Sequence, residues 1–193
     1  MGDSRWTTLA AVSIAAVLLT GGVAMMAAFH TTSTTPSSSA PLSAQHNAVL
    51  DLTLAYNRML GTYVYTNTGI SIPANTPVVV TITNHDPSVN TLFVPGDNRV
   101  IGTVGGIEAV NMGNGPVMVS SLPTSGISHT FTVLDGLYNI SVPIPPAPSS
   151  SIPSVVTFEL MMGYAETTSW ACVCHCMPNV MMPGMYGPLV ITS

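Results

Sequence analysis

The sequence predicts an all-β domain, a Greek-key β-sandwich, joined to one N-terminal transmembrane helix. Three observations support this fold class. Several short segments after about residue 48 alternate apolar and polar residues, with the period of a half-buried strand. Gly and Pro, with 16 residues each, interrupt the chain between those segments. Near the N-terminus, by contrast, 21 successive residues carry no charge.

The uncharged run, residues 9–29 (LAAVSIAAVLLTGGVAMMAAF), is long enough to span a bilayer. At about 1.5 Å per residue it covers a hydrocarbon core of about 30 Å. A cleaved secretory signal has a shorter apolar region, about 7–15 residues, so we expect a retained anchor. Arg5 precedes the run and no basic residue follows until Arg58. This asymmetry predicts a single-pass protein of the cell membrane with residues 1–8 in the cytoplasm and its C-terminal domain extracellular.

A Ser/Thr/Pro-rich linker follows the predicted anchor over residues 30–47. Its central stretch, TTSTTPSSSAPLSAQ, has too few apolar residues to build a core, so it is expected to be a flexible stalk. The remaining residues, 48–193, are enough for one globular domain.

The predicted strands of that domain are short and separated by turn residues. Alternation is clearest in 78–83 (VVVTIT), 129–133 (HTFTV) and 155–160 (VVTFEL). Further strand candidates are 49–56, 62–66, 91–94, 117–120, 138–142, 168–173 and 188–192. The Gly-rich stretch 102–116 is expected to be a loop insertion. This pattern of many short strands favours a sandwich or a barrel.

The charge content excludes several classes of function. Only 6% of the residues are charged, and none is lysine. A nucleic-acid groove requires clustered Lys and Arg, so no nucleic-acid partner is expected. The carboxylates are scattered, which gives no pair for acid–base catalysis, and we expect no catalysis by this chain alone. An uncharged surface suits a domain that faces an acidic exterior, as in an acidophile, although compositional drift explains it equally well.

The C-terminal segment WACVCHCMPNVMMPGMYGPLVITS is rich in cysteine, histidine and methionine, the residue types whose side chains can bind soft metals. It contains every cysteine of the chain, one histidine and a run of methionines, namely Cys172, Cys174, Cys176, His175, Met177, Met181, Met182 and Met185. Thiolate, imidazole and thioether are soft ligands that suit copper, especially Cu(I). Structural zinc would need a second ligand pair elsewhere, and none is evident.

These motifs resemble the cupredoxin family, most of all the exported domain of subunit II of haem-copper oxidases. In that family the last loop reads C-x3-C-x3-H-x2-M, and here Cys172-x3-Cys176 and Met185-Tyr-Gly match parts of it. Residues 77–96 (PVVVTITNHDPSVNTLFVPG) resemble an upstream strand, a D-x-x-H-x-F motif and a further strand. The resemblance implies a cupredoxin fold, copper held by Cys172, Cys176 and an axial Met185, and electron transfer in a respiratory terminal oxidase with other membrane subunits as partners.

Both copper-binding histidines of that family are replaced here. The upstream one falls at Val89 or Asn90, and the downstream one falls near Met182. Met182 or His175 would then fill a vacated position. Alternatively the domain is metal-free, with a disulfide between two cysteines and the methionines as core residues. A tethered mononuclear carrier resembling sulfocyanin and a copper-free structural subunit of the cell envelope also remain open.

Two other histidines are placed by their surroundings. His129 shares a strand face with Phe131 and Val133, which predicts a core histidine more than a metal ligand. His85 lies in a turn, from which it could replace the missing upstream ligand. Trp170 is expected in the core. Asn139 begins a glycosylation pattern, N-I-S, within a predicted strand.

Overall fold

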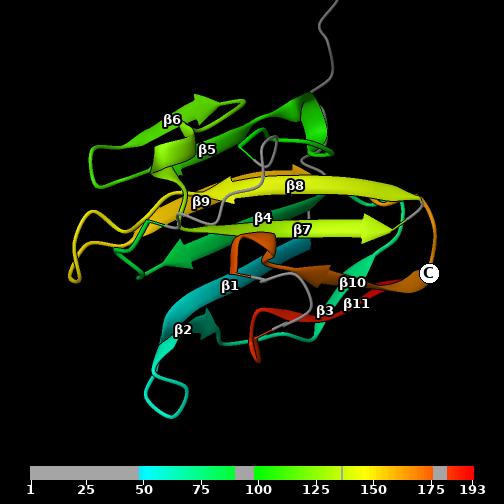
Figure 1. Cartoon of the computed structure of the whole chain (residues 1–193). Coiled ribbons are helices and arrows are strands. Elements are labelled where there is room, and N and C mark those ends of the chain that lie inside the picture. The colour runs from blue at the N-terminus through cyan, green and yellow to red at the C-terminus, as the bar shows by residue number, and fades with distance from the viewer. Residues whose placement is uncertain (1–47, 90–97, 136, 176–181) are drawn as a thin grey trace, which may run out of the picture. The chain divides into compact units, whose positions relative to one another are not determined.

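The computed structural model describes residues 48–89, 98–135, 137–175 and 182–193, with the side chains of residues 134, 135 and 175 excepted. All of these residues belong to one compact unit, Ser43–Ser193. Over the described ranges the chain forms eleven β-strands and three short 3-10 turns (Figure 1). The predicted all-β class is therefore confirmed.

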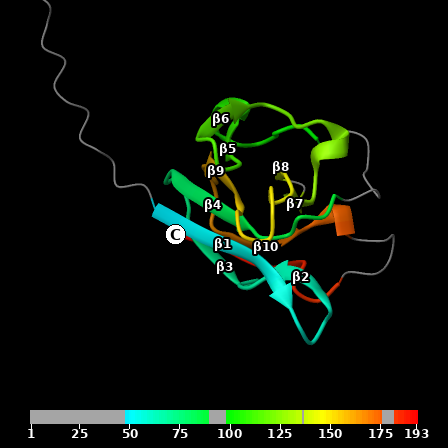
Figure 2. The same cartoon turned by 90° about the vertical axis from the view of Figure 1, so that its left-hand side faces the viewer.

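Six strands form one sheet in the order β2-β1-β4-β9-β5-β6. Their bounds are β1 (Ala48–Asn57), β2 (Thr62–Tyr65), β4 (Val78–Asn84), β5 (Glu108–Asn111), β6 (Pro116–Val119) and β9 (Ser154–Leu160). β1 and β4 run parallel, and the other neighbours are antiparallel. Figure 2 shows the sheet from one side, with the β5–β6 hairpin above and β2 below.

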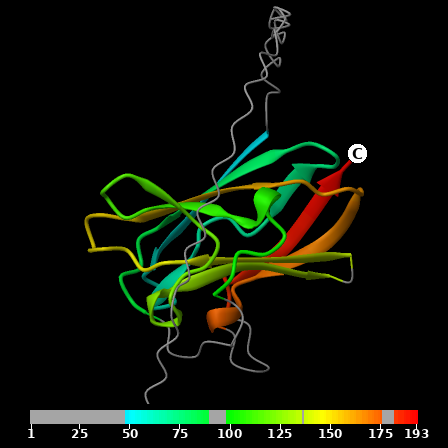
Figure 3. The same cartoon turned by 90° about the horizontal axis from the view of Figure 1, so that it is seen from above.

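The other five strands form a second sheet in the order β3-β11-β10-β7-β8. They are β3 (Ile70–Pro73), β7 (His129–Asp135), β8 (Tyr138–Ile144), β10 (Glu166–Ala171) and β11 (Tyr186–Thr192). β11 pairs parallel with β3 and antiparallel with β10, which lies beside it in Figure 3. The last strand is thus paired on both sides and can hold the preceding loop in place.

The two sheets pack face to face over one apolar core. In β4 and β9 every second residue is buried, and the paired residues Val80 and Phe158 both point into the core. Phe158 of the six-stranded sheet lies 6.0 Å, between ring centroids, from Phe131 of the five-stranded sheet. Tyr65 and Trp170 meet across the same interface at 4.6 Å. The period-two pattern therefore predicted the inward faces of β4 and β9 correctly, because each of these strands buries one face against the other sheet.

The sequence prediction was wrong over the Gly-rich stretch 102–116. This stretch contains β5, which pairs with both β9 and β6 and so belongs to the sheet. β3 was also not predicted. Other expectations lie outside the described residues: the anchor at 9–29, the linker at 30–47 and the strand candidate at 91–94. Within the ranges that are described, no helix has the length and apolar character needed to span a membrane.

β5 places a carboxyl group inside the sandwich. The side chain of Glu108 is fully buried, and its two carboxylate oxygens have no hydrogen-bond partner among the described residues. Burial raises the pKa of Glu108 to about 8, because a charged carboxylate in an apolar environment lacks its hydration. The group is therefore neutral in acidic and neutral solution.

Candidate metal centre

The loop between β10 and β11 brings together Cys172 and Met185, two of the predicted site residues. Cys172 directly follows β10, and Met185 directly precedes β11. The backbone N–H of Cys172 donates to the carbonyl oxygen of Met185 at 2.7 Å, and both side chains are buried. Met182 is half-buried against the same core, and its carbonyl oxygen accepts the N–H of Met185 at 3.0 Å. A thiol and thioethers therefore lie at one end of the sandwich.

Two glycines allow the Met185 end of this loop to pack closely. Gly184 has a φ of +81°, and a Cβ there would lie 2.7 Å from the Cβ of Val64 in β2. A Cβ on Gly187 would collide with the carbonyl oxygen of Thr68. Residues with side chains are excluded from both positions, so the backbone around Met185 is fixed by the neighbouring strand and turn.

Cys174 also lies at this end of the sandwich, although it was not among the predicted ligands. It belongs to the 3-10 turn η3 (Val173–His175) and is buried. Cys172 and Cys174 form no disulfide in the described part of the chain. Burial first, and then the nearness of these two cysteines, raise the pKa of Tyr65 well above its ordinary value. The hydroxyl of Tyr65 donates to the carbonyl oxygen of Thr130 at 3.1 Å.

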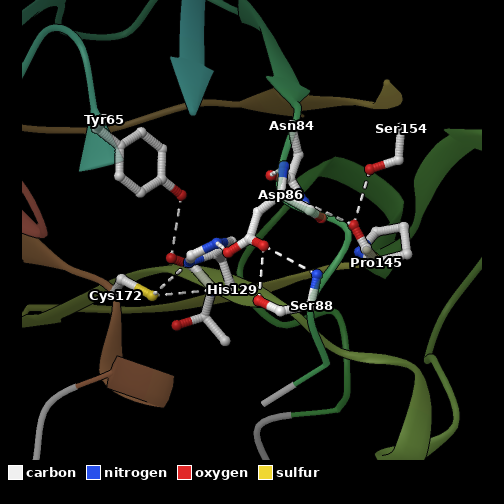
Figure 4. Close-up of polar contacts among 9 residues, drawn as sticks. Tyr65, Asn84, Asp86, Ser88, His129, Pro145, Ser154 and Cys172 are labelled. Carbon is white, nitrogen blue, oxygen red and sulfur yellow. Dashed lines mark hydrogen bonds and ion pairs between the residues drawn. The ribbon is translucent and has the colours of Figure 1, made fainter. Parts of the chain in front are cut away.

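A buried row of three side chains extends from Cys172 into the sandwich (Figure 4). The Sγ of Cys172 lies 3.7 Å from Nδ1 of His129, and Nε2 of His129 lies 2.9 Å from Oδ2 of Asp86. The prediction that His129 points into the core is confirmed, since none of it is exposed. Its partners were not predicted, because Asp86 and Cys172 are each 43 residues away in sequence.

Asp86 is held in place by the turn that follows β4. Its Oδ1 accepts the backbone N–H and the hydroxyl of Ser88, at 2.8 and 2.6 Å. The backbone N–H of Asp86 donates to Oδ1 of Asn84 at 2.9 Å, and the Asn84 amide in turn donates to the carbonyl oxygen of Pro145 at 2.9 Å. These bonds leave Oδ2 of Asp86 directed at His129.

The charges of the Asp86–His129 pair follow from this geometry. Burial alone would lower the pKa of His129, but its hydrogen bonds with Asp86 and Cys172 raise it to about 9. Burial would raise the pKa of Asp86, and the hydrogen bonds from His129 and Ser88 outweigh it and bring the pKa below its ordinary value. The pair is therefore ionised at neutral pH, so each charge compensates the other in the core.

Backbone contacts also fix the thiol. The N–H of Thr130 donates to Sγ of Cys172 at 3.3 Å, and the N–H of Val173 donates to the hydroxyl of Thr130 at 2.9 Å. Trp170, two residues before Cys172, stacks on Phe131 and donates from its indole to the carbonyl oxygen of Thr68. Trp170 is thus a core residue, as expected.

The remaining predicted ligands are not placed. Cys176 lies outside the described residues, and His175 is described only as backbone of η3. In the upstream motif, Val89 is exposed and residues 90–97 are not described. Across the described ranges, no cluster of three or more His, Cys, Asp or Glu residues has an arrangement that would hold a metal ion.

Comparison with known proteins gives matches among solved structures alone. No family model and no curated protein matches the chain. Solved structures of cupredoxins do match. Reduced rusticyanin is 14% identical over 76% of this chain and 81% of its own, with a TM-score of 0.40. Rusticyanin from Thiobacillus ferrooxidans is 15% identical over 76% of this chain and 79% of its own, with a TM-score of 0.39. Auracyanin B is 14% identical over 76% of this chain and 89% of its own, with a TM-score of 0.33.

Proposed function

We propose that this protein binds copper at the β10–β11 loop and transfers electrons on the outer face of the cell membrane. One observation supports this most strongly: Cys172 and Met185 lie together in the core, joined by a backbone hydrogen bond of 2.7 Å. A thiol and a thioether are soft ligands, and copper prefers them over the oxygen ligands that hard cations take. When bound, copper supplies one-electron redox chemistry.

The residues at this end of the sandwich fit such an ion. Cys172 receives a backbone N–H from Thr130, the kind of bond that stabilises a thiolate. Gly184 and Gly187 hold the backbone of Met185 against neighbouring segments, and the backbone of Met185 is hydrogen-bonded to that of Cys172. A ligand backbone fixed in this way would keep nearly the same geometry around Cu(I) and Cu(II). A small change in geometry between the two oxidation states favours fast electron transfer. We further propose Cys176, Met182 and His175 as the remaining ligand candidates.

The membrane location and the respiratory role extend this proposal. The uncharged segment 9–29 would anchor the domain, and the resemblance of the Cys172–Met185 segment to oxidase subunit II would make it an electron-entry subunit of a terminal oxidase. Intact-mass measurement of the native protein tests the anchor. A mass that lacks about the first 25 residues would show a cleaved signal instead.

An acidic exterior is the third part of the proposal. The surface has very few charges, and the one fully buried glutamate among the described residues, Glu108, is neutral at acidic pH. Both features keep the folded state stable where surface carboxylates become protonated. The pH dependence of unfolding, discussed below, tests this part separately from copper binding.

The copper experiment uses the full-length protein, purified in detergent and reduced. Cu(I) is added, unbound metal is removed by desalting, and bound copper is counted per chain. Cys172→Ser and Cys176→Ser should each lose copper, whereas Cys174→Ser, which removes a neighbouring buried thiol, should retain it. Circular dichroism checks that each variant keeps its β-structure. Copper retained by both of the first two variants would place the metal away from Cys172 and Cys176. No copper bound by the wild type would leave the copper-free envelope subunit as the better proposal.

A further inference from the structure

The sequence contains a single acceptor pattern for N-linked glycosylation, formed by Asn139, Ile140 and Ser141. No other asparagine of the chain has Ser or Thr two positions later. Asn139 is the second residue of β8, and its side chain is exposed. Its carboxamide forms no hydrogen bond with any described residue. The acceptor nitrogen is therefore accessible on the surface of the folded domain.

We infer that Asn139 carries an N-linked glycan in the mature protein. The inference rests on the exported location in the proposed function, because this modification belongs to chains that reach the outer side of a membrane. The sugar donor is an oligosaccharide linked to a polyprenyl phosphate or diphosphate. Nδ2 of Asn139 bonds to the anomeric carbon, the bond from that carbon to the phosphate oxygen breaks, and the lipid phosphate leaves. The amide gives up one proton, which balances the negative charge left on the lipid phosphate.

The position of Asn139 keeps a glycan away from the candidate metal centre. β7 and β8 run antiparallel, and Asn139 pairs with Leu134 near the end of β7, whereas His129 begins β7. At about 3.4 Å per residue, Asn139 lies about 17 Å along the strands from the level of His129. His129 contacts Cys172, and η3 lies at that end of the strands, away from the start of β8 (Figure 1). A glycan on Asn139 therefore leaves the metal end of the sandwich open.

Ser141 determines when the sugar is transferred. Its side chain is buried, and its Oγ has no hydrogen-bond partner among the described residues. Its backbone exchanges two hydrogen bonds with Ile101, at 2.8 and 3.0 Å, which close over this part of β8. A glycosyltransferase that recognises the hydroxyl of the acceptor pattern cannot reach it in the folded domain. The sugar is therefore added before β8 packs, and folding then leaves Asn139 and its glycan on the surface.

A glycan at this position supplies hydration that the surface otherwise lacks. Only 6% of the residues are charged and none is lysine, the residue that most often protects exposed sheet edges. β8 lies at the edge of the five-stranded sheet and contains no charged residue. Ile101 covers this edge at Ser141, and Asn139 lies beyond that contact. A bulky, hydrated group on Asn139 would keep other chains from pairing with the start of β8.

The main test is peptide mass spectrometry of the full-length protein purified from its source membranes. After digestion at aromatic residues, the peptide that contains Asn139 should be heavier than its sequence by the mass of an oligosaccharide. Electron-transfer fragmentation assigns the sugar to Asn139 or to the serines of the same peptide. A peptide with unmodified Asn139, or with sugar on its serines alone, would overturn the inference.

Variants made in the source cells identify the acceptor pattern. Asn139→Gln and Ser141→Ala should lose the glycan, whereas Ser141→Thr, which keeps the hydroxyl, should retain it. Asn114→Gln is the matched control, because Asn114 is an exposed asparagine without an acceptor pattern, and it should also retain the glycan. Loss of the glycan in Asn114→Gln, or its retention in Ser141→Ala, would contradict the inference.

Two measurements separate this inference from the proposed function. Asn139→Gln should bind as much Cu(I) per chain as the wild type, because the acceptor lies away from the metal end. A protease added to intact cells shows whether the domain is outside. Unmodified Asn139 in a domain that this protease cleaves would overturn the glycosylation alone. A domain that the protease does not reach would overturn the exported location, and the glycosylation with it.

Discussion

The Nε2 atom of His129 and the Oδ2 atom of Asp86 lie 2.9 Å apart in the core and join the two layers of the sandwich. His129 belongs to β7 of the five-stranded sheet, and Asp86 follows β4 of the six-stranded sheet. Apolar contacts elsewhere in the core depend little on orientation. The hydrogen bond of this pair, by contrast, forms only when the two sheets pack at one particular position relative to each other. The pair thus specifies how the layers face each other, apart from any role with a metal.

The first prediction concerns the stability of the metal-free protein. Asp86→Ala removes one partner of the buried pair and leaves a buried charge uncompensated. The free energy of unfolding should fall by about 3–5 kcal/mol, measured by urea denaturation. A double-mutant cycle with His129→Gln should give a coupling of at least about 1 kcal/mol. Additive effects of the two substitutions would show that the pair does not link the sheets.

The second prediction concerns pH and Glu108. Its pKa of about 8 in the folded state lies above the ordinary value of 4.5, so the folded state binds more protons between these two pH values. The free energy of unfolding should therefore fall as pH rises from about 4.5 to 8, by a total on the order of 5 kcal/mol. Below pH 4.5 the group is neutral in both states and contributes no pH dependence.

Glu108→Gln should flatten this pH dependence, because the amide does not titrate. Asp51→Asn is the matched control, since it removes an exposed carboxylate of β1 and should leave the dependence unchanged. Unfolding by urea at a series of pH values measures both variants. Equal slopes for the wild type and Glu108→Gln would contradict the prediction and weaken the case for adaptation to an acidic exterior.

The third prediction concerns the close approach of Gly187 to Thr68. Gly187→Ala places a Cβ against the Thr68 carbonyl oxygen, so β11 must shift. The expected loss of stability is about 1–3 kcal/mol, and copper affinity should fall too because Met185 is two residues away. Gly69→Ala, on the same turn but with open space around its Cβ position, should change stability by less than about 0.5 kcal/mol. Similar melting temperatures for the two variants would refute this account.

The fourth prediction concerns the hydroxyl of Tyr65, which donates to the Thr130 carbonyl oxygen in the core. Tyr65→Phe should reduce the free energy of unfolding by about 1 kcal/mol, because the carbonyl loses a partner without access to water. Tyr56→Phe changes an exposed tyrosine of β1 and should have almost no effect. Thermal unfolding followed by circular dichroism compares the two. A loss of stability in Tyr56→Phe as large as in Tyr65→Phe would argue against this role for the hydrogen bond.

The sandwich could be predicted from the sequence where strands were long enough to show their period. β4, β7 and β9 have seven residues each, and they appear where the alternation was predicted, at 78–83, 129–133 and 155–160. β5 and β3 have four residues each, too few for a period to stand out. β5 also lies among glycines with positive φ, whose turns made its surroundings resemble a loop.

Only the part of the candidate site that lies within one continuous segment of the sequence could be predicted. Cys172 and Met185 are 13 positions apart on one loop, and their residue types alone indicated a soft-metal site. His129 and Asp86 lie on other strands and turns, and no spacing rule connects them with Cys172. The alternation of β7 predicted that His129 is buried. Only the packing of the two sheets shows what it is buried against.

The pairing of β3 with β11 has a consequence for how the domain folds. Leu189 pairs with Ile70, so this contact closes a chain segment of about 119 residues. Until β11 arrives, β3 has no partner in its sheet and β10 presents an open edge. Contacts so distant in sequence make folding slow, on the order of milliseconds to seconds. During that interval the exposed edges are open to pairing with other chains, so efficient production of this protein should depend on low concentration or on chaperones.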